Sequence, residues 1–206
     1  MGDARGPSEE GAGRRRGSFV DKVWFWAPIV PMIALDLWSK AAAFGYLEGR
    51  QPLHPGGARR VNEFDFLPDP FGFALVDWRN TGTIWGLGRD FTLPLIVLRA
   101  AALLLLLWLA WRTPAWRRLQ LLVLGLIFAG AVGNLYDNLF MPGSGVRDFL
   151  LFYYRDAGGQ EHHFPAFNVA DACISVGAIS LALLLWRQPD AKADTAPETA
   201  QDGQEP

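Results

Sequence analysis

The pattern of hydrophobic and polar positions divides the chain into four long apolar stretches separated by polar loops. The stretches are residues 23–46, 91–111, 119–136 and 167–186. Asp36 and Lys40 interrupt the first stretch, while the second and the fourth each hold one charge, Arg99 and Asp171. A helix of about 20 apolar residues crosses the hydrocarbon core of a bilayer. The pattern predicts four transmembrane helices, because four such helices buried in so small a soluble protein would leave too little polar surface.

The first stretch also has one feature of a cleavable signal peptide, since Arg14, Arg15 and Arg16 precede it. It is longer than the usual apolar region of a signal peptide, however, and it contains Asp36 and Lys40. It offers no clean cleavage site of small residues. We therefore expect a retained helix.

Basic residues predict how the helices are oriented, because short cytoplasmic loops are enriched in Lys and Arg. Arg112, Arg117 and Arg118 crowd the connection between the second and third stretches. More basic residues lie near the chain ends: Arg5, Arg14, Arg15, Arg16, Lys22, Arg187 and Lys192. Six tryptophans lie near the same interface: Trp24, Trp26, Trp108, Trp111, Trp116 and Trp186. Both termini are therefore predicted to be cytoplasmic.

Three kinds of segment are predicted along the chain. Residues 1–22 and 187–206 have the composition of disordered cytoplasmic tails. Residues 23–186 form the membrane domain. Within it, residues 48–90 combine Pro and Gly with short apolar runs such as 71–76, which indicate strands. The expected fold is an all-α membrane protein with four transmembrane helices and a small extracytoplasmic β-rich cap.

Composition removes several classes of function. The 206 residues carry a formal net charge of -2 and one cysteine, Cys173. Nucleic-acid binding needs a concentrated basic field, so no nucleic acid is expected as a partner. A single cysteine excludes a disulfide framework and a multi-cysteine metal site. His162 and His163 are interpreted as solvated, and neither a metal nor a cofactor is expected.

Two acidic residues stand out because the topology brings them to one membrane face. Asp148 precedes the fourth stretch, and Asp171 lies inside its beginning. Two carboxylates held close share a proton, so that one can activate water while the other donates a proton to an amide carbonyl. The same positions also suit helix capping or pairing with arginine, and the spacing alone leaves these alternatives open.

Five short motifs, in order along residues 30–180, resemble those of lipoprotein signal peptidase, also called signal peptidase II. Each contains at least one polar residue in or beside an apolar stretch. The motifs are Asp36-x-x-Ser39-Lys40, Asn80-x-Gly82, Gly133-Asn134-x-x-Asp137, Gly145-Val146-x-Asp148-Phe149 and Phe167-Asn168-Val169-Ala170-Asp171. Five ordered motifs are a far more specific signal than any one of them.

The resemblance implies an aspartic protease of the bacterial cytoplasmic membrane, with its active site near the outer face. It would remove signal peptides from diacylglyceryl-modified prolipoproteins, just before the lipidated cysteine. Asp148 and Asp171 match the catalytic pair. The positions matching substrate-binding or supporting residues are Asn80, Asn134, Asp137, Asn168, Asp36 and Lys40. The implied partners are these prolipoproteins and membrane lipids, and the protein is expected to be a monomer.

The chain departs from the family pattern in two places. Asn138 follows Asp137 where the family usually has Arg, which leaves Arg147 and Arg79 as candidate substitutes. Thr83-Ile84-Trp85 replaces the common Ala-Ala-Phe, and the larger side chains would narrow the groove they line. Arg99 is interpreted as structural, either reaching the interface or pairing with an acidic group.

Two other functions were weighed against the protease. One is a membrane scaffold that binds lipoproteins and has lost efficient catalysis. The other is a small proton-coupled transporter that uses Asp36, Lys40, Asp148 and Asp171. Transport predicts charged groups spread along a pathway through the bilayer, whereas Asp137, Asp148 and Asp171 cluster at one face and the place of Asp36 and Lys40 depends on their depth. The clustering favours hydrolysis.

Overall fold

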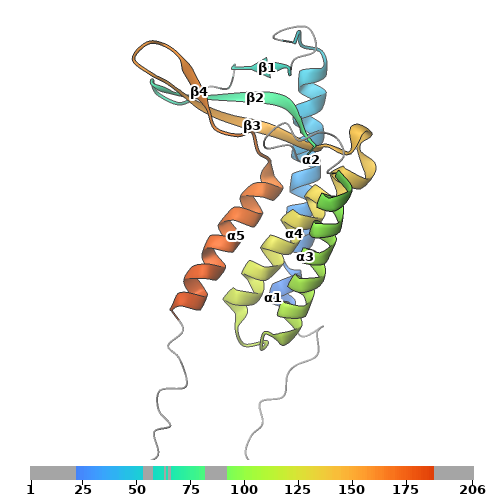
Figure 1. Cartoon of the computed structure of the whole chain (residues 1–206). Helices are drawn as coiled ribbons and strands as arrows, with labels where there is room; N and C mark the ends of the chain where they lie inside the picture. The colour runs from blue at the N-terminus through green and yellow to red at the C-terminus, as the bar shows by residue number, and fades with distance from the viewer. Residues whose placement is uncertain (1–21, 53–57, 63, 65, 82–91, 188–206) are drawn as a thin grey trace, which may run out of the picture.

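Four long helices run side by side, and a small antiparallel sheet lies across one end of them (Figure 1). This computed structural model describes residues 22–52, 58–62, 64, 66–81 and 92–187. The helices are α1 (Val23–Trp26), α2 (Ile29–Glu48), α3 (Thr92–Arg112), α4 (Arg118–Phe140) and α5 (Val169–Trp186). A short 3-10 helix, Pro142–Ser144, follows α4. The strands are β1 (Arg60–Val61), β2 (Phe71–Asn80), β3 (Val146–Arg155) and β4 (Glu161–His163).

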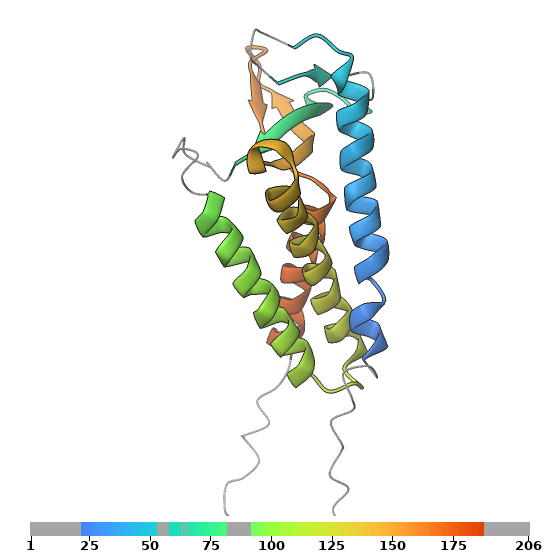
Figure 2. The ribbon, with the colours of Figure 1, turned by 90° about the vertical axis from the view of Figure 1, so that its right-hand side faces the viewer.

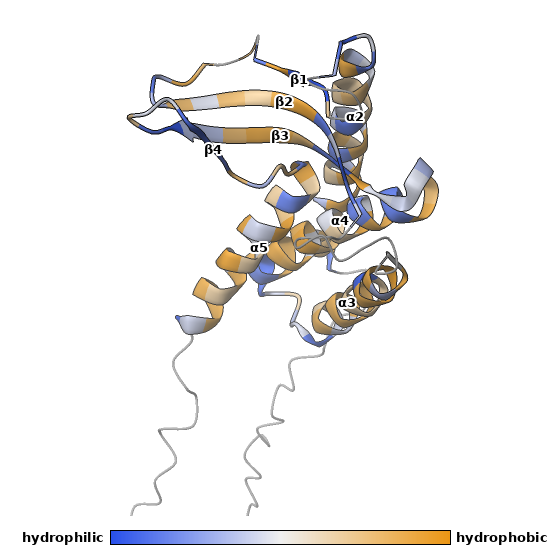
Figure 3. Ribbon diagram, turned by 45° about the horizontal axis from the view of Figure 1, so that its top comes forward, coloured by the Kyte–Doolittle hydropathy of each residue, from blue (hydrophilic) through white to orange (hydrophobic). Residues whose placement is uncertain are grey.

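The four predicted apolar stretches are confirmed as helices of membrane-spanning length and composition. The candidate spans are Val23–Glu48, Leu93–Arg112, Arg118–Phe140 and Val169–Trp186. The first is divided by a break at Ala27 and Pro28, where α1 ends and α2 begins. Most of the helical ribbon has the colour of hydrophobic residues (Figure 3). Large apolar side chains such as Leu98, Leu104 and Ile179 are exposed. An apolar outer surface is what a lipid environment requires.

Helix α4 is the centre of the bundle, with α2 on one side of it and α3 on the other (Figure 2). Half of its span is buried, compared with 11% of α3. Glycines allow the close approach: a Cβ at Gly130 would lie 2.4 Å from the backbone oxygen of Ala170 on α5. A Cβ at Gly125 would likewise lie 2.1 Å from the backbone oxygen of Phe25 on α1, so small residues of α4 pack helices together within one chain.

The sheet has the order β1-β2-β3-β4, and all of its neighbours are antiparallel. The prediction of strand near 71–76 is confirmed by β2. The all-α description was incomplete, however, and the cap is not confined to residues 48–90. Strands β3 and β4 come from the connection between α4 and α5. The sheet therefore joins two loops that are far apart in sequence, and β3 brings Asp148 next to Trp78 of β2.

The first and last helices begin and end at the end of the bundle that lies away from the sheet (Figure 1). Lys22, the one described residue of the predicted N-terminal tail, is buried there. Its ammonium donates to the backbone oxygens of Ala110 (2.6 Å) and Trp111 at the end of α3. A cation is favoured at these carbonyls because the helix dipole is negative there. Residues 1–21 and 188–206 lie outside the described residues.

Candidate active site

The two candidate carboxylates belong to β3 and α5, which are separated along the chain by β4. Asp148 lies on β3 and is 1% exposed, while Asp171 lies in the first turn of α5 and is partly buried. Leu150 of β3 pairs with Phe167, just before α5 begins. This bridge ties the start of the helix to the strand. It therefore sets where Asp171 lies relative to Asp148.

Asn168 caps α5 and fixes Asp171 by two reciprocal hydrogen bonds. The backbone nitrogen of Asp171 donates to Asn168 Oδ1 at 2.9 Å, and the backbone nitrogen of Asn168 donates to Asp171 Oδ2 at 3.1 Å. This is a capping box, in which each side chain satisfies a free backbone N–H of the first turn. The cap predicts that Asp171 keeps one orientation.

Two buried asparagines connect the carboxylates. Nδ2 of Asn168 donates to Asp148 Oδ1 at 2.7 Å, and Nδ2 of Asn134 donates to Asp171 Oδ1 at 2.7 Å. Asn168 Nδ2 also lies 3.1 Å from Asn134 Oδ1. Both asparagines are at most 2% exposed. Asp148 and Asp171 are thus the two ends of one continuous chain of hydrogen bonds.

A buried network of ion pairs contacts this series of hydrogen bonds through Asn134. Lys40 Nζ lies 2.7 Å from Asp36 Oδ2, 3.3 Å from Asp137 Oδ2 and 3.2 Å from Asn134 Oδ1. Arg147 binds Asp137 at 2.8 Å through its guanidinium and at 2.9 Å through its backbone nitrogen. Because every charge in the network has a partner, the network can remain buried.

Helices α2, α4 and α5 meet at this network. The backbone nitrogen of Ala170 donates to Asp36 Oδ1 at 2.9 Å, which links α2 to the first turn of α5. Gly133 of α4 leaves the space for this contact, since a Cβ there would lie 2.4 Å from Asp36 Oδ2. Asn80, at the end of β2, reaches Asp148 with its side chain. Three helices and two strands therefore contribute to one site.

Burial is the largest influence on the ionisation of Asp148. Desolvation, and next the negative charge of Asp171, raise the pKa of Asp148 to about 7, against the smaller opposing effects of Asn80, Asn168 and Lys40. A raised pKa keeps a proton on this pair near neutral pH. The arrangement thus provides both a proton donor and a proton acceptor, as the hydrolysis of an amide requires.

The eight residues that the sequence predicts as catalytic, substrate-binding or supporting lie in this one cluster. They are Asp36, Lys40, Asn80, Asn134, Asp137, Asp148, Asn168 and Asp171. Gly82 and Thr83-Ile84-Trp85 lie outside the described residues. Capping and catalysis are not exclusive alternatives for Asp171, because its side chain takes part in the capping box and also binds Asn134.

The candidate substitutes for the family arginine are placed differently from the expectation. Arg147 is engaged by Asp137, and Arg79 donates to the backbone oxygen of Pro142 at 3.4 Å and lies over the Phe44 ring. The cation that reaches Asn138 is Arg99 of α3, which donates to Asn138 Oδ1. Sequence reasoning treated Arg99 as structural. Its one available signal was its position as the single charge in residues 91–111.

The two histidines of the sheet are each paired with an acidic side chain. His162 lies 3.0 Å from Asp156, and His163 lies 3.0 Å from Glu161, on the exposed sheet. Hydrogen bonding to Arg60 is the largest of the effects that lower the pKa of Glu161 to about 2. Within the described residues, no group of three or more His, Cys, Asp or Glu side chains could hold a metal ion.

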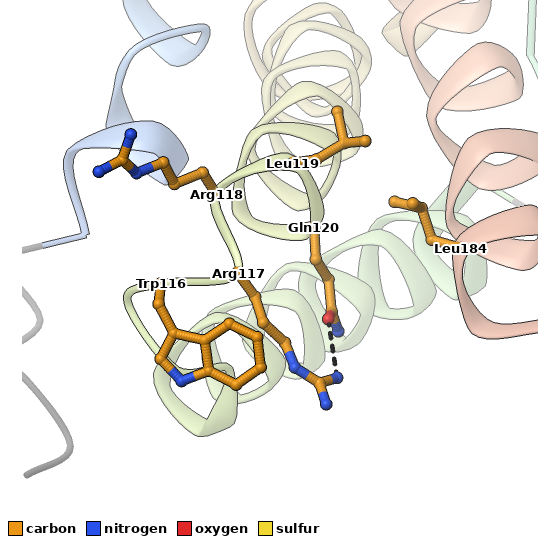
Figure 4. Close-up of a pocket in the computed structure, with 6 residues that line it drawn as sticks. All are labelled: Trp116, Arg117, Arg118, Leu119, Gln120 and Leu184. Carbon is orange, nitrogen blue, oxygen red and sulfur yellow. Dashed lines mark hydrogen bonds between the residues drawn. The ribbon is translucent and has the colours of Figure 1, made fainter. Parts of the chain in front are cut away.

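The hollow drawn in Figure 4 lies at the opposite end of the bundle, between the start of α4 and the end of α5. It has a volume of about 450 Å³ and is lined by Trp116, Arg117, Arg118, Leu119, Gln120 and Leu184. Arg117 donates to Gln120 at 3.3 Å there. The lining contains no carboxylate, so this hollow has no chemistry in common with the Asp148 and Asp171 cluster.

Known proteins resemble this chain over most of its length. The profile of the family described as signal peptidase (SPase) II matches residues 29–187, which include all eight clustered residues. The chain belongs to the signal peptidase II family. Its members are aspartic proteases that remove signal peptides from prolipoproteins, and this is the function of the chain. The scaffold and transporter alternatives are not supported.

Individual relatives extend the match over most of the chain. The lipoprotein signal peptidase of Cellvibrio japonicus is 35% identical over 191 residues, which cover 86% of this chain and 95% of the relative. That of Symbiobacterium thermophilum is 40% identical over 128 residues, or 60% of this chain and 76% of the relative. A bacterial membrane enzyme solved at 2.3 Å resolution has the same fold, with a TM-score of 0.60 and 20% identity over 84% of this chain and 93% of its own.

Proposed function

We propose that Asp148 and Asp171 are the catalytic pair of this signal peptidase II. The observation that carries the proposal is the chain of hydrogen bonds through Asn168 and Asn134, which holds the two carboxylates beside each other at the edge of the membrane helices. Asn80 and Asn134 line the site and contact the carboxylates. Asp36, Lys40 and Asp137 fix the positions of Asn134 and the first turn of α5.

The reaction needs one proton shared by the pair. The ionised carboxylate takes a proton from water as the water oxygen attacks the scissile carbonyl, and the protonated carboxyl gives its proton to the carbonyl oxygen. When the tetrahedral intermediate collapses, the C–N bond breaks and the departing amine receives a proton from the carboxyl that had accepted one. The other carboxylate takes a hydroxyl proton back from the intermediate, which restores the shared proton. The shared proton belongs to the pair, because Asn168 and Asn134 join the two carboxylates in one hydrogen-bonded site.

The substrate is a prolipoprotein that carries a diacylglyceryl group, and it is cut just before the lipidated cysteine. Such a substrate reaches the site laterally through the bilayer, because its acyl chains stay among the lipids. Asp148 lies on the sheet and Asp171 at the beginning of α5, so the pair lies near the level where membrane meets water. Water is therefore available for hydrolysis, and membrane lipids surround the apolar surface of the helices.

We place the sheet outside the cytoplasm and both chain termini inside. The first helix begins and the last helix ends at the end of the bundle opposite the sheet (Figure 1), which supports a common side for the termini. Arg112, Arg117 and Arg118 lie at that end, as expected for a cytoplasmic loop. Residues 23–186 act as one protease domain with the sheet as its outer cap, and the protein works as a monomer.

Cleavage of a synthetic diacylglyceryl-modified prolipoprotein peptide by the full chain in lipid tests the catalytic pair. Asp148→Asn and Asp171→Asn should each lower the rate at least a thousandfold, because each removes one of the two proton carriers. Asp156→Asn is the matched control, since Asp156 is an aspartate in the exposed turn before β4 and should leave the rate unchanged. Full cleavage by either site variant would contradict the proposal.

A second measurement tests the orientation and the oligomeric state. Reporter domains fused to the two termini should give cytoplasmic signals, whereas a reporter inserted after Gly158 should give an outer signal. Light scattering in detergent should give the mass of one chain. An outer signal from either terminus would contradict the proposed orientation, and a dimer mass would contradict the monomer.

A further inference from the structure

Arg99 carries a charge in the interior of a membrane-spanning helix. The other charged residue of α3 is Arg112, which lies in the last turn. An ionised group within such a helix is costly and calls for a partner or a function. The guanidinium of Arg99, which is partly buried, donates to Asn138 Oδ1 on α4. Because Asn138 is a neutral amide, this hydrogen bond leaves the positive charge uncompensated.

Asn138 is held so that its oxygen is directed toward Arg99. It is 2% exposed, and its Nδ2 donates to the backbone oxygen of Ser144 at 2.6 Å. Both polar atoms of the amide therefore have one defined partner. Asn138 also follows Asp137 directly in α4, which places Arg99 one residue away from the buried ion-pair network. The Asn138 amide therefore holds the guanidinium of Arg99 in one position.

The other cations around the carboxylates are already occupied. Lys40 is paired with Asp36 and Asp137, and Arg147 is paired with Asp137. Arg99 makes no ion pair with the described carboxylates. The acidic groups whose charges act on its guanidinium are nevertheless Asp171, Asp148 and Asp137, with Asp171 first. Arg99 thus approaches the catalytic pair from α3 without being neutralised by direct contact.

The balance of charge gives Arg99 a reason to stay ionised. With one proton shared by Asp148 and Asp171, the buried site holds three negative charges, on Asp36, on Asp137 and on the pair. Lys40 and Arg147 supply two positive charges. Arg99 brings the sum to zero, so its charge is stabilised by the site although it lies in an apolar helix.

We propose that Arg99 binds the substrate by donating hydrogen bonds to the peptide carbonyl oxygens next to the scissile bond, and that Asn138 positions it. A guanidinium has five N–H donors, and Asn138 receives one of them. An extended peptide that leaves water for this site brings carbonyl oxygens that need donors. The planar fork of arginine can serve two such oxygens, which the single point charge of a lysine cannot do as well.

The inference rests on the proposed function, since it places the peptide against Asp148 and Asp171. The test compares the full chain in lipid with Arg99→Gln, Arg99→Lys and the matched control Arg112→Gln, an arginine of the same helix at its far end. The substrate is the synthetic diacylglyceryl-modified prolipoprotein peptide. Arg99→Gln should lower kcat/KM roughly tenfold to a hundredfold, mostly through a higher KM, because charged hydrogen bonds to the substrate are lost. Arg112→Gln should stay within twofold.

A binding measurement separates recognition from folding. In the inactive Asp148→Asn background, Arg99→Gln should weaken the Kd for the same peptide about tenfold or more. Arg99→Lys should raise KM at least about threefold while kcat changes less, because lysine lacks the planar pair of N–H donors that arginine presents. If Arg99→Gln does not fold, the KM of Arg99→Lys alone tests the proposal. An unchanged KM and Kd in the folded variants would overturn the proposal.

The pH profile tests whether the charge of Arg99 acts on the catalytic pair. The charged groups facing Asp148 are Asp171, Lys40 and Arg99. Removing the positive charge of Arg99 makes ionisation of the pair less favourable, so the fall in activity at high pH should move to a higher pH. If Asp148→Asn and Asp171→Asn are inactive but Arg99→Gln leaves KM, Kd and this limb unchanged, the Arg99 inference alone fails. If the Asp variants still cut the peptide, the catalytic pair fails first.

Discussion

The side-chain nitrogen of Asn168 lies 2.7 Å from Oδ1 of Asp148, so the residue that caps α5 also binds the carboxylate of the neighbouring strand. The oxygen of the same amide accepts the backbone N–H of Asp171. One side chain therefore sets the relative position of the two carboxylates. The geometry of the site depends on the beginning of a helix, where backbone groups need a cap in any case.

Two substitutions at Asn168 separate its capping role from its contact with Asp148. Asn168→Ala removes both, and should cost about 1 kcal/mol of stability as well as most of the activity. Asn168→Ser retains a capping oxygen but is too short to reach Asp148. It should therefore keep the thermal unfolding midpoint while lowering the cleavage rate roughly tenfold or more. Equal activity of Asn168→Ser and the unchanged chain would contradict the positioning role.

The rate of cleavage should fall as the pH rises above neutral. Burial and the charge of Asp171 raise the pKa of Asp148 to about 7, so the proton that the pair must share is lost near that pH. Above it, the rate should drop about tenfold for each further pH unit, as expected for a single essential proton. Initial rates between pH 5 and 9 measure this limb. A rate that stays constant to pH 9 would exclude a proton donor of this kind.

The stability of the protein should change with pH in the same direction. Because the folded pKa of Asp148 lies above the ordinary aspartate value of 3.8, the folded state holds more protons than the unfolded state between these pH values. The contribution of this group is fully present below the lower value and is lost as the pH rises through about 7. Asp148→Asn should weaken this dependence. Unfolding midpoints of both proteins at pH 5 and pH 8 provide the comparison.

Lys40 should be the most costly residue of the buried network to replace. Lys40→Met leaves the carboxylates of Asp36 and Asp137 without their shared cation, and should destabilise the fold by about 3–5 kcal/mol. Adding Asp36→Asn should recover part of this loss, since an amide keeps the acceptor for the Ala170 N–H without the charge. Thermal unfolding of Lys40→Met and of the double variant tests whether the double variant is the more stable of the two. A double variant less stable than Lys40→Met would argue against the electrostatic explanation.

Two helical glycines should respond to alanine in opposite directions. At Gly133 the new methyl group would lie 2.4 Å from Asp36 Oδ2, so Gly133→Ala should lower stability by about 1–3 kcal/mol and disturb the site. Gly45 of α2 has nothing within 4 Å of the same position. Gly45→Ala should therefore leave activity unchanged and stabilise the helix by about 0.5–1 kcal/mol. A neutral Gly133→Ala would show that α2 and α4 do not need their close approach.

Much of the site was readable because its residues occupy apolar sequence. Asp36, Lys40 and Asp171 each interrupt a stretch that would otherwise be free of charge, and a charge in such a place must find a partner or perform a function. Strands β3 and β4 were not foreseen. Residues 146–155 begin with the motif around Asp148 and end with a run of large apolar residues. Their strand structure depends on pairing with β2, about seventy residues earlier in the chain.

The partner of Arg99 could not be predicted from the sequence for the same reason. A single arginine in an apolar helix can reach the interface or pair with a carboxylate, and nothing local distinguishes these outcomes from contact with Asn138. The substitution of Asn for the family arginine at position 138 was visible, but its replacement came from another helix. Only the packing of α3 against α4 relates the two positions.

The sequence by itself determined the four helices, and it predicts their direction across the membrane and the residues that carry the chemistry. These depend on local properties: apolar length, basic residues in loops, and polar groups where lipid should be. The tertiary structure decided the extent of the sheet, the connection of Asp148 to Asp171 through two asparagines, and the place of Arg99. Those features join segments that are distant in the chain, and their geometry exists only when α4 has packed against its neighbours and β2 has paired with β3.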